Sequence, residues 1–344
     1  MKAAYMLNKQ IHVGEVPDPK LTRQGQVLVK THVCACCASD LHVLKNAEAL
    51  TEWSKKYNGP FNMDLDRPVV LGHEYVGEIV DYAPGSERKL KEGARVVALP
   101  VVMRPDGIDI VGLTNDYPGG FGEYMLLDEH FLLEVPNGLD SDSASLVEPL
   151  AVGLHHVRLA QVRKDEIPIV VGCGAIGLAV IAGLKLHGIG PIIAADFSAK
   201  RREVALAMGA DAAIDPREVP AYGPIPALGN KQASYIFECV GIAGVLDEMF
   251  QSCQAGARIM SGGWCLKPDT MFTACAHMKR LNVQFAGGEE PEDFVLSLNS
   301  IADGKIDVTP WIGAKVGLSG VGDGLEGITN PDNPIRTLVD PRAL

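Results

Sequence analysis

Three short segments carry the side chains that bind transition metals in proteins. They are CACCASDLH (34–42), GHEYVGEIV (72–80) and VEPLAVGLHHV (147–157), and they offer thiols, imidazoles and carboxylates. A catalytic zinc site commonly takes three ligands of these types and leaves one position open. The three segments therefore predict a catalytic metal site. Eight cysteines in a chain without an apparent export signal also favour metal binding over disulfides.

A second chemical pattern, Gly172-x-Gly174-x-x-Gly177, lies in VVGCGAIGL. It follows a predicted strand and opens a predicted helix, which is the context of a dinucleotide-binding turn. Gly172 permits the tight turn, Gly174 lets the pyrophosphate approach the backbone, and Gly177 lets helix and strand pack closely. The predicted cofactor contacts here are Gly172, Gly174, Ala175, Ile176 and Gly177. A glycine-rich turn of another α/β protein is the alternative.

Asp196 ends the next predicted strand, at the spacing expected of the acidic residue that binds the ribose. Its carboxylate would accept hydrogen bonds from both ribose hydroxyls and would repel a 2′-phosphate. We therefore predict NAD as the cofactor in preference to NADP.

The elements that must hold this turn alternate along the second half of the chain. Predicted strands cover 167–171, 191–196, 212–214, 234–239, 257–262 and 282–287, and predicted helices cover 175–187, 199–208 and 243–251. This alternation indicates a parallel sheet of the doubly wound, nucleotide-binding type. The uncharged run 167–184 approaches the length of a membrane span, but its four glycines and one proline favour a buried strand, turn and helix.

The first 150 residues have a different character, because they are rich in Val, Gly and Pro and show short strand patterns with few helical ones. We expect a β-rich, barrel-like domain there. The tail after about residue 290 shows one helix and several strand-like pieces, and we expect it to pack on one of the two domains.

The overall composition is that of a soluble globular protein with about two domains, since 47% of the 344 residues are hydrophobic and 22% are charged. The net charge of −12 argues against nucleic-acid binding. The N-terminal segment shows no apolar stretch long enough for a signal peptide. We expect a cytoplasmic protein with neither a nucleic acid nor a membrane as partner.

Taken in order, the motifs resemble those of the zinc-dependent medium-chain dehydrogenases, which include alcohol, sorbitol and threonine dehydrogenases. The resemblance spans nearly the whole chain and rests on CASDLH for C-x-[ST]-D-x-H, GHEYVG for G-H-E-x-x-G, GGFGEYMLL, EPLAVGLH, the glycine pattern and ECVG (238–241). It implies a GroES-like catalytic domain over 1–150, to which 290–344 returns. It also implies a Rossmann NAD-binding domain over 151–289.

The resemblance further implies Cys37, His73 and Glu148 as the zinc ligands. Glu148 matches the glutamate of sorbitol-dehydrogenase-like members, where other members place cysteine. Asp40 matches the carboxylate that orients the ligand histidine. Glu74 is interpreted either as a group that approaches the metal during turnover or as a structural carboxylate. The neighbouring cysteines at 34 and 36 are interpreted as small buried hydrophobic residues.

Four further residues receive roles from the resemblance. Ser39 would hydrogen-bond the substrate oxygen, and His42 would pass the proton outward because its unperturbed pKa lies near neutrality. Val240 of ECVG is implied as a cofactor contact, and Arg336 is implied at the cofactor pyrophosphate. A plain surface histidine and a surface ion pair are the alternatives for His42 and Arg336.

Two departures from the family pattern carry predictions of their own. Many members bind a second, structural zinc with four cysteines, but the corresponding segment 99–120 has no cysteine. We therefore predict one zinc per subunit, no structural zinc and a shortened lobe. The segment 46–70 is long for the family, and we expect a loop. Its Trp53, Tyr57 and Phe61 would form a substrate wall or lid, or would pack at a subunit interface.

The expected function is that of an NAD-dependent, zinc-containing alcohol dehydrogenase. The metal lowers the pKa of the substrate hydroxyl, and hydride passes from the carbinol carbon to the nicotinamide. Glu148 favours a secondary alcohol or polyol, by resemblance to the polyol branch. The alternatives are a carbonyl or alkene reductase of the same superfamily and a cofactor-binding protein without activity. The expected partners are a small-molecule alcohol or carbonyl and further copies of the chain, in a homodimer or homotetramer.

Overall fold

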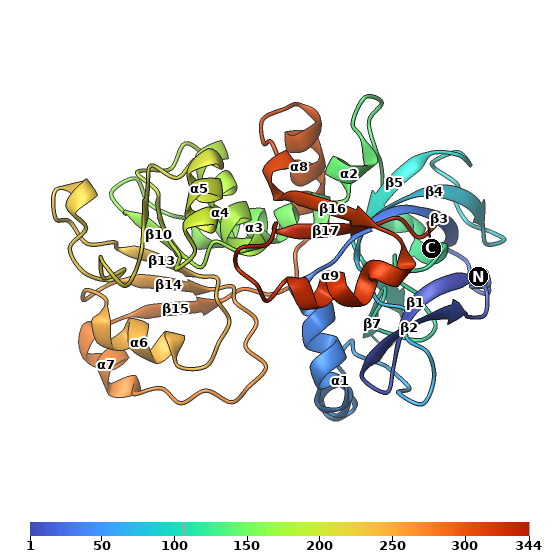
Figure 1. The fold of residues 1–344 in the computed structure, drawn as a ribbon, viewed down its shortest axis with the longest axis horizontal. Helices are drawn as coiled ribbons and strands as arrows, with labels where there is room; N and C mark the ends of the chain where they lie inside the picture. The colour runs from blue at the N-terminus through green and yellow to red at the C-terminus, as the bar shows by residue number, and fades with distance from the viewer. Residues whose placement is uncertain (106, 344) are drawn as a thin grey trace. The chain divides into compact units, whose positions relative to one another are not determined.

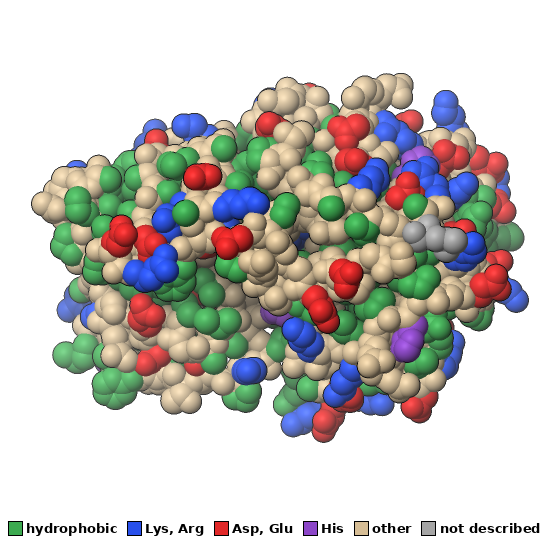
Figure 2. Space-filling model, viewed as in Figure 1, with side chains coloured by type: hydrophobic (Ala, Val, Ile, Leu, Met, Phe, Trp, Pro, Cys, Tyr) green, Lys and Arg blue, Asp and Glu red, His purple; other side chains and the backbone are tan. Residues whose placement is uncertain are grey.

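The computed structural model describes residues 1–105 and 107–343, which form two compact units (Figure 1). Unit 1 comprises Met1–Glu148, Leu298–Ala302 and Trp311–Leu344, and unit 2 comprises Pro149–Ser297 and Asp303–Pro310. In the part of the chain that the structure describes, no helix combines the length and apolar character that crossing a bilayer requires. Figure 2 shows acidic and basic side chains interspersed on the visible face.

Unit 2 is built on a parallel sheet of six strands. In spatial order they are β12 (Ala212–Ile214), β11 (Ile193–Ala195), β10 (Pro168–Val171), β13 (Tyr235–Glu238), β14 (Arg258–Ser261) and β15 (Asn282–Phe285). This is the 3-2-1-4-5-6 order of a dinucleotide-binding fold. Every residue of β10 and β13 is buried, as expected of central strands covered on both faces. The predicted α/β half of the fold class is confirmed.

Helices cover both faces of this sheet, with α4 and α5 on one side and α6 and α7 on the other (Figure 1). Right-handed crossovers between parallel strands produce this arrangement when the strand order reverses at β10. The helices of the region are α3 (Val147–Ala160), α4 (Ala175–Leu186), α5 (Ala199–Ala207), α6 (Val245–Ser252), α7 (Thr273–Lys279) and α8 (Pro291–Ala302), with a 3-10 turn at η2 (Pro226–Leu228).

Unit 1 is β-rich, as predicted for the first 150 residues. Its largest sheet has the order β16 (Ile312–Val316), β17 (Arg336–Val339), β3 (Gln26–Ala35), β4 (Glu74–Tyr82), β5 (Arg95–Ala98) and β9 (Leu132–Glu134), and β8 (Tyr124–Asp128) also pairs with β3. Two hairpins complete it, namely β1 (Lys2–Leu7) with β2 (Gln10–Glu15) and β6 (Val101–Arg104) with β7 (Gly107–Ile110). The cysteine-free segment thus contributes a short hairpin.

The helical parts of unit 1 are few. They are α1 (Ala38–Tyr57), α2 (Ser141–Ala144), α9 (Val321–Gly327) and the 3-10 turns η1 (Glu129–Phe131) and η4 (Leu318–Gly320), and η3 (Thr309–Trp311) lies at the boundary of the units. The C-terminal strand β17 pairs antiparallel with β3, so the end of the chain completes the N-terminal sheet.

Helix α1 corrects one prediction. The segment 46–70 was expected to be a loop, but α1 continues to Tyr57 after a kink at Asn46. Trp53 and Tyr57 therefore lie on the last turns of a helix. Their ring centroids are 5.8 Å apart, and the ring of Phe61 lies 6.3 Å from that of Trp53. Trp53 and Tyr57 are exposed whereas Phe61 is buried, and the role of these three aromatic residues stays a prediction.

Candidate metal centre and cofactor site

Three strand ends of unit 1 bring two of the three predicted metal ligands, Cys37 and His73, close to Glu74 and Arg336. Strand β3 ends at Ala35, two residues before Cys37, and Ala35 pairs with Glu74 at the start of β4. His73 directly precedes that strand. Strand β17 runs antiparallel to β3 and begins with Arg336 at the same end of the sheet. The register of three strands therefore makes neighbours of residues that are far apart in the sequence.

The donor atoms of Cys37, His73 and Glu74 lie within 4.8 Å of one another. Oγ of Ser39 donates a hydrogen bond to Sγ of Cys37 (3.0 Å) and lies 2.9 Å from Nε2 of His73. Nε2 is thus the imidazole nitrogen that faces the thiol. One thiolate, one imidazole and one carboxylate gathered in this way match the ligand types that Zn²⁺ prefers.

Asp40 fixes the orientation of His73 from behind. Its Oδ1 lies 3.2 Å from Nδ1 of His73 and accepts the N–H of Gly72 at 3.1 Å. Its Oδ2 accepts the N–H of Cys37 at 3.2 Å, closing the capping box that starts α1. One buried carboxylate therefore begins the helix and leaves Nε2 of the imidazole for a metal.

The protonation of the two central donors is coupled to their surroundings. Burial and the nearby Glu74 raise the pKa of the Cys37 thiol, while Arg336 and His73 oppose this effect. Burial lowers the pKa of His73, but Asp40 and Cys37 outweigh it and hold that pKa well above its ordinary value. A metal must displace protons from both groups, because only the thiolate and the neutral imidazole coordinate.

Arg336 contributes a buried cation beside the metal site. Its Nε and Nη2 donate to the two carboxylate oxygens of Glu74 at 2.8 and 2.7 Å, and Nη2 lies 3.6 Å from Sγ of Cys37. Burial lowers the pKa of Arg336, but Glu74 and Cys37 raise it above its ordinary value. The structure therefore gives this guanidinium a partner other than the predicted pyrophosphate. Glu74 and Arg336 are only 0% and 3% exposed.

Glu148 lies apart from the tightest group of donors. It stands in the first turn of α3 and is buried, and its charge contributes to raising the pKa of Arg336. Among the described residues, the cluster within 4.8 Å contains Glu74 and not Glu148. Sequence reasoning left the role of Glu74 open, and the distances now favour it as a ligand.

His42 lies on α1, in the turn that follows Ser39. It is half-buried, and burial together with Lys45 lowers its pKa. The imidazole is therefore neutral at pH 7 and able to accept a proton.

The glycine pattern in unit 2 forms the predicted turn. Gly172 has a φ of +90°, and a Cβ at Gly177 would lie 1.9 Å from the carbonyl oxygen of Gly172. Gly174 is the N-cap of α4, and Ala175 and Ile176 form the first turn of this helix. N–H groups at such a helix start bind anions such as a pyrophosphate.

Asp196 and Arg201 lie beside this turn. The Asp196 carboxylate accepts the N–H groups of Cys173 and Ser198, both at 2.8 Å, which leaves lone pairs for ribose hydroxyls. Nη1 of Arg201 lies 3.5 Å from the position of a Cβ at Gly174. Arg201 was not predicted as a site residue. Its position on the helix that follows Asp196 is the feature of the sequence that could have indicated it. Val240 is exposed and lies in the turn after β13.

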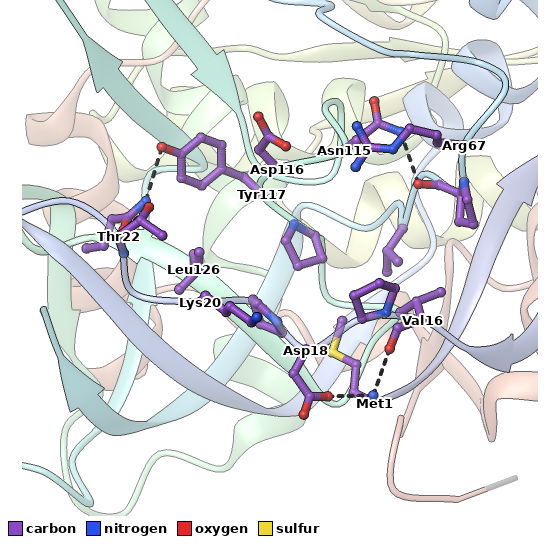
Figure 3. Close-up of a pocket in the computed structure, with 16 residues that line it drawn as sticks. Met1, Val16, Asp18, Lys20, Thr22, Arg67, Asn115, Asp116, Tyr117 and Leu126 are labelled. Atoms are coloured by element: carbon purple, nitrogen blue, oxygen red, sulfur yellow. Dashed lines mark hydrogen bonds and ion pairs between the residues drawn. The ribbon is translucent and has the colours of Figure 1, made fainter.

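A separate cavity of about 540 Å³ opens in unit 1 (Figure 3). Its lining includes Lys20 and Arg67 and also the acidic Asp18 and Asp116, so charges of both signs face it. Asp18 already pairs with the N-terminal amine at 2.5 Å. None of the predicted site residues lines this cavity, and we therefore treat it as distinct from the candidate site.

Comparison with family models finds two matches. Residues 23–137 match the alcohol dehydrogenase GroES-like domain, and residues 175–302 match the zinc-binding dehydrogenase domain. The first match includes Cys37, His73 and Glu74, and the second begins within the glycine pattern, at residue 175.

Curated relatives and solved structures agree with these matches. The chain is 32% identical to (R,R)-butanediol dehydrogenase of Bacillus subtilis (strain 168) over 77% of this chain and 78% of that protein. It is 29% identical to sorbitol dehydrogenase of the same organism over 75% and 74% of the two chains. A crystal structure of 2R,3R-butanediol dehydrogenase from Bacillus subtilis aligns with a TM-score of 0.81 and 28% identity, over 99% of each chain.

Proposed function

Because the chain belongs to the zinc-dependent medium-chain alcohol dehydrogenases, we propose that it oxidises a secondary alcohol or a polyol, with NAD as the hydride acceptor. The observation that carries this proposal is the gathering of Cys37, His73 and Glu74 donors within 4.8 Å, next to the Ser39 hydroxyl. A zinc ion held there would supply Lewis acidity that lowers the pKa of a substrate hydroxyl.

The chain's own residues then handle the proton. Oγ of Ser39 already contacts Cys37 and His73, so it is within reach of a hydroxyl that binds between these groups. It accepts the hydroxyl proton and passes it toward His42, which is neutral at pH 7 because burial and Lys45 lower its pKa. The imidazole of His42 carries the proton outward along α1.

The ligand set is proposed as Cys37, His73 and one or both of the carboxylates Glu74 and Glu148. Glu74 is favoured by distance, while Glu148 is favoured by its place in the motif EPLAVGLH. One thiolate and one carboxylate carry two negative charges, which equals the ligand charge of the two thiolates in a Cys₂His catalytic zinc site. The proposal places one catalytic zinc in each chain, and the cysteine-free hairpin β6–β7 offers no thiols for a second one.

A substrate with two or more hydroxyl groups is proposed from the relatives. The names butanediol, sorbitol and D-xylulose recur among the proteins that the chain resembles. All three are small compounds that carry a secondary hydroxyl or the matching ketone. The substrate class proposed here is therefore a short diol or polyol.

The cofactor contacts are proposed at the turn of unit 2 and at Val240. Gly174, Ala175 and Ile176 at the start of α4 would hold the pyrophosphate, and Asp196 would accept hydrogen bonds from the ribose hydroxyls. Val240 is exposed and follows β13, next to this turn. The carboxylate of Asp196 disfavours the 2′-phosphate of NADP.

Self-association into a homodimer or homotetramer is also proposed. Strand β15 is the last strand of its sheet, and its end residue Phe285 is 68% exposed. An open strand edge with an exposed aromatic side chain pairs readily with another strand. Light scattering of the eluted protein tests this, since F285E should shift an oligomer toward the monomer. The cytoplasmic location stays a prediction that cell fractionation tests.

The test of the proposed activity is NADH formation by purified protein on primary alcohols, secondary alcohols and polyols. We expect turnover on diols or polyols, loss of turnover in C37S, and loss after zinc removal. Turnover of an activated alkene that survives chelation would favour the reductase alternative. If the protein binds zinc and NAD but forms no NADH with any of the alcohols, the proposal is overturned.

A further inference from the structure

Glu238, the last residue of β13, places a buried carboxylate beneath the turn 239–241. Its Oε1 accepts the N–H groups of Val240 and Gly241 at 2.7 and 2.8 Å, and its Oε2 accepts the hydroxyl of Ser261 at 3.2 Å. The side chain is 2% exposed. The turn that carries Val240 is therefore held from below by a single carboxylate.

The side chain of Glu238 accepts three hydrogen bonds. All three of its contacts are donors, and acceptance without donation is the behaviour of an ionised carboxylate. Among the ion pairs of the described residues, none joins Glu238 to a lysine or arginine. Neutral hydrogen-bond donors stabilise the charge without cancelling it.

The position of Glu238 in the sheet relates it to the cofactor. It pairs with Val171 of β10, so it stands where the strand order reverses. Dinucleotides bind across the carboxyl ends of the strands at this reversal, one mononucleotide on each half. Asp196 and the glycine turn belong to the half formed by β10, β11 and β12, which leaves the half formed by β13, β14 and β15 for the nicotinamide nucleotide.

The turn above Glu238 also lies next to the glycine turn at residue 172. A Cβ at Gly172 would lie 2.9 Å from Cγ2 of Val240 and 3.0 Å from the main chain of Cys239. The turn 239–241 is therefore packed against the pyrophosphate turn. Gly263 adds a second support, because its N–H donates to the main-chain oxygen of Glu238 at 2.9 Å.

We propose that Glu238 is a positioning residue for the nicotinamide half of the cofactor, and that its uncancelled charge favours the oxidised cofactor over the reduced one. The nicotinamide ring of NAD⁺ carries a positive charge that NADH lacks, so a buried anion on this half of the sheet attracts only the oxidised ring. This inference rests on the proposed NAD-dependent function.

The experiment measures the Kd of NAD⁺ and of NADH separately, by calorimetry, for the wild type, E238Q, E238D and S261A. E238Q keeps the shape and removes the charge, so the ratio Kd(NAD⁺)/Kd(NADH) should rise about five- to tenfold. S261A removes one neutral donor and should leave the ratio within about twofold of the wild type. E238D keeps the charge on a shorter arm, so both Kd values should rise together at an unchanged ratio.

Each outcome decides the matter. An unchanged ratio in folded E238Q overturns the electrostatic part, and unchanged Kd values in E238D overturn the positioning part. If circular dichroism shows E238Q to be unfolded, an altered ratio in E238D overturns the proposal and an unaltered ratio with weaker binding supports it. Failure of the wild type to bind either cofactor form would refute the proposed function, which distinguishes that failure from failure of this inference alone.

Discussion

Replacing Asp40 by asparagine should weaken zinc binding about 10- to 100-fold, because the carboxylate orients a ligand histidine. In the structure Oδ1 of Asp40 lies 3.2 Å from Nδ1 of His73 and accepts the N–H of Gly72, while Oδ2 of Asp40 accepts the N–H of Cys37. An asparagine oxygen can replace Oδ1, but its NH₂ group then faces the N–H of Cys37. One hydrogen bond is lost and two donors oppose each other.

The size of the effect follows from these contacts. The expected 10- to 100-fold loss corresponds to about 1.4–2.8 kcal/mol of zinc-binding free energy. The lost hydrogen bond to the N–H of Cys37 acts separately, because it lowers the stability of the metal-free protein as well. The assay is competition for zinc between the metal-free protein and a chromophoric chelator, so it needs no substrate.

A matched control is available in the same unit. Asp128 is also a nearly buried carboxylate that contacts a histidine, since Oδ1 lies 2.8 Å from Nδ1 of His130 and accepts the N–H of His130 at 3.1 Å. His130 is absent from the metal cluster of the described residues. D128N should leave zinc affinity within about twofold of the wild type. Less than a threefold change in D40N, or an equal loss in D128N, would refute the reasoning.

Three further predictions follow. R336M should lower the free energy of unfolding by about 3–5 kcal/mol, because it leaves Glu74 buried without its counter-charge; an unchanged midpoint in urea would contradict this. D196S should raise kcat/KM for NADP relative to NAD by about tenfold or more, since the repelling carboxylate is removed, and steady-state kinetics with both cofactors measure it. Burial raises the pKa values of the Cys34 and Cys36 thiols well above their ordinary range. Iodoacetamide at pH 8 should therefore label these two thiols slowly, as peptide mass spectrometry can measure, and faster labelling of them than of the half-buried Cys265 would contradict the packing.

The nucleotide-binding unit was predictable because its signals are local. Strands such as 167–171 and 234–239 are short apolar runs bounded by glycine or polar residues, and they alternate with helical patterns. Each strand is buried on both faces, so burial and sequence pattern coincide. The structure places β10 and β13 within these runs.

Part of the metal site was predictable for a related reason. Cys37 and Asp40 lie in the motif CASDLH, and His73 lies in the motif GHEYVG, so each residue can be identified from its own local motif. The buried positions of Cys34 and Cys36 also agree with their interpretation as small hydrophobic residues.

The Glu74–Arg336 ion pair could not be predicted in this way. Its members are 262 positions apart and meet only because β17 returns to β3. No local pattern around either residue indicates that pairing. The sequence suggested either the pyrophosphate or a surface ion pair for Arg336, and the structure shows a buried ion pair with Glu74.

Helix α1 was missed because its buried face is chemically mixed. Leu50 is buried there beside the polar Thr51 and Ser54, while the large Trp53 and Tyr57 face outward. An amphipathic pattern indicates a helix when apolar residues face the core and polar residues face outward. Here polar residues are buried and aromatic residues are exposed, so the pattern does not indicate the helix. Ser54 instead stabilises the chain beyond the helix, since its Oγ accepts the N–H of Phe61 at 2.7 Å.

The most direct test of the account is a zinc titration of the metal-free enzyme, followed by the initial rate of NADH formation on the best diol or polyol. We expect no NADH formation without metal, a rate that rises linearly with added zinc until one zinc ion is bound per chain, and no recovery of the rate in C37S. A rate in the metal-free enzyme, a rise that continues to two zinc ions per chain, or recovery in C37S would contradict it.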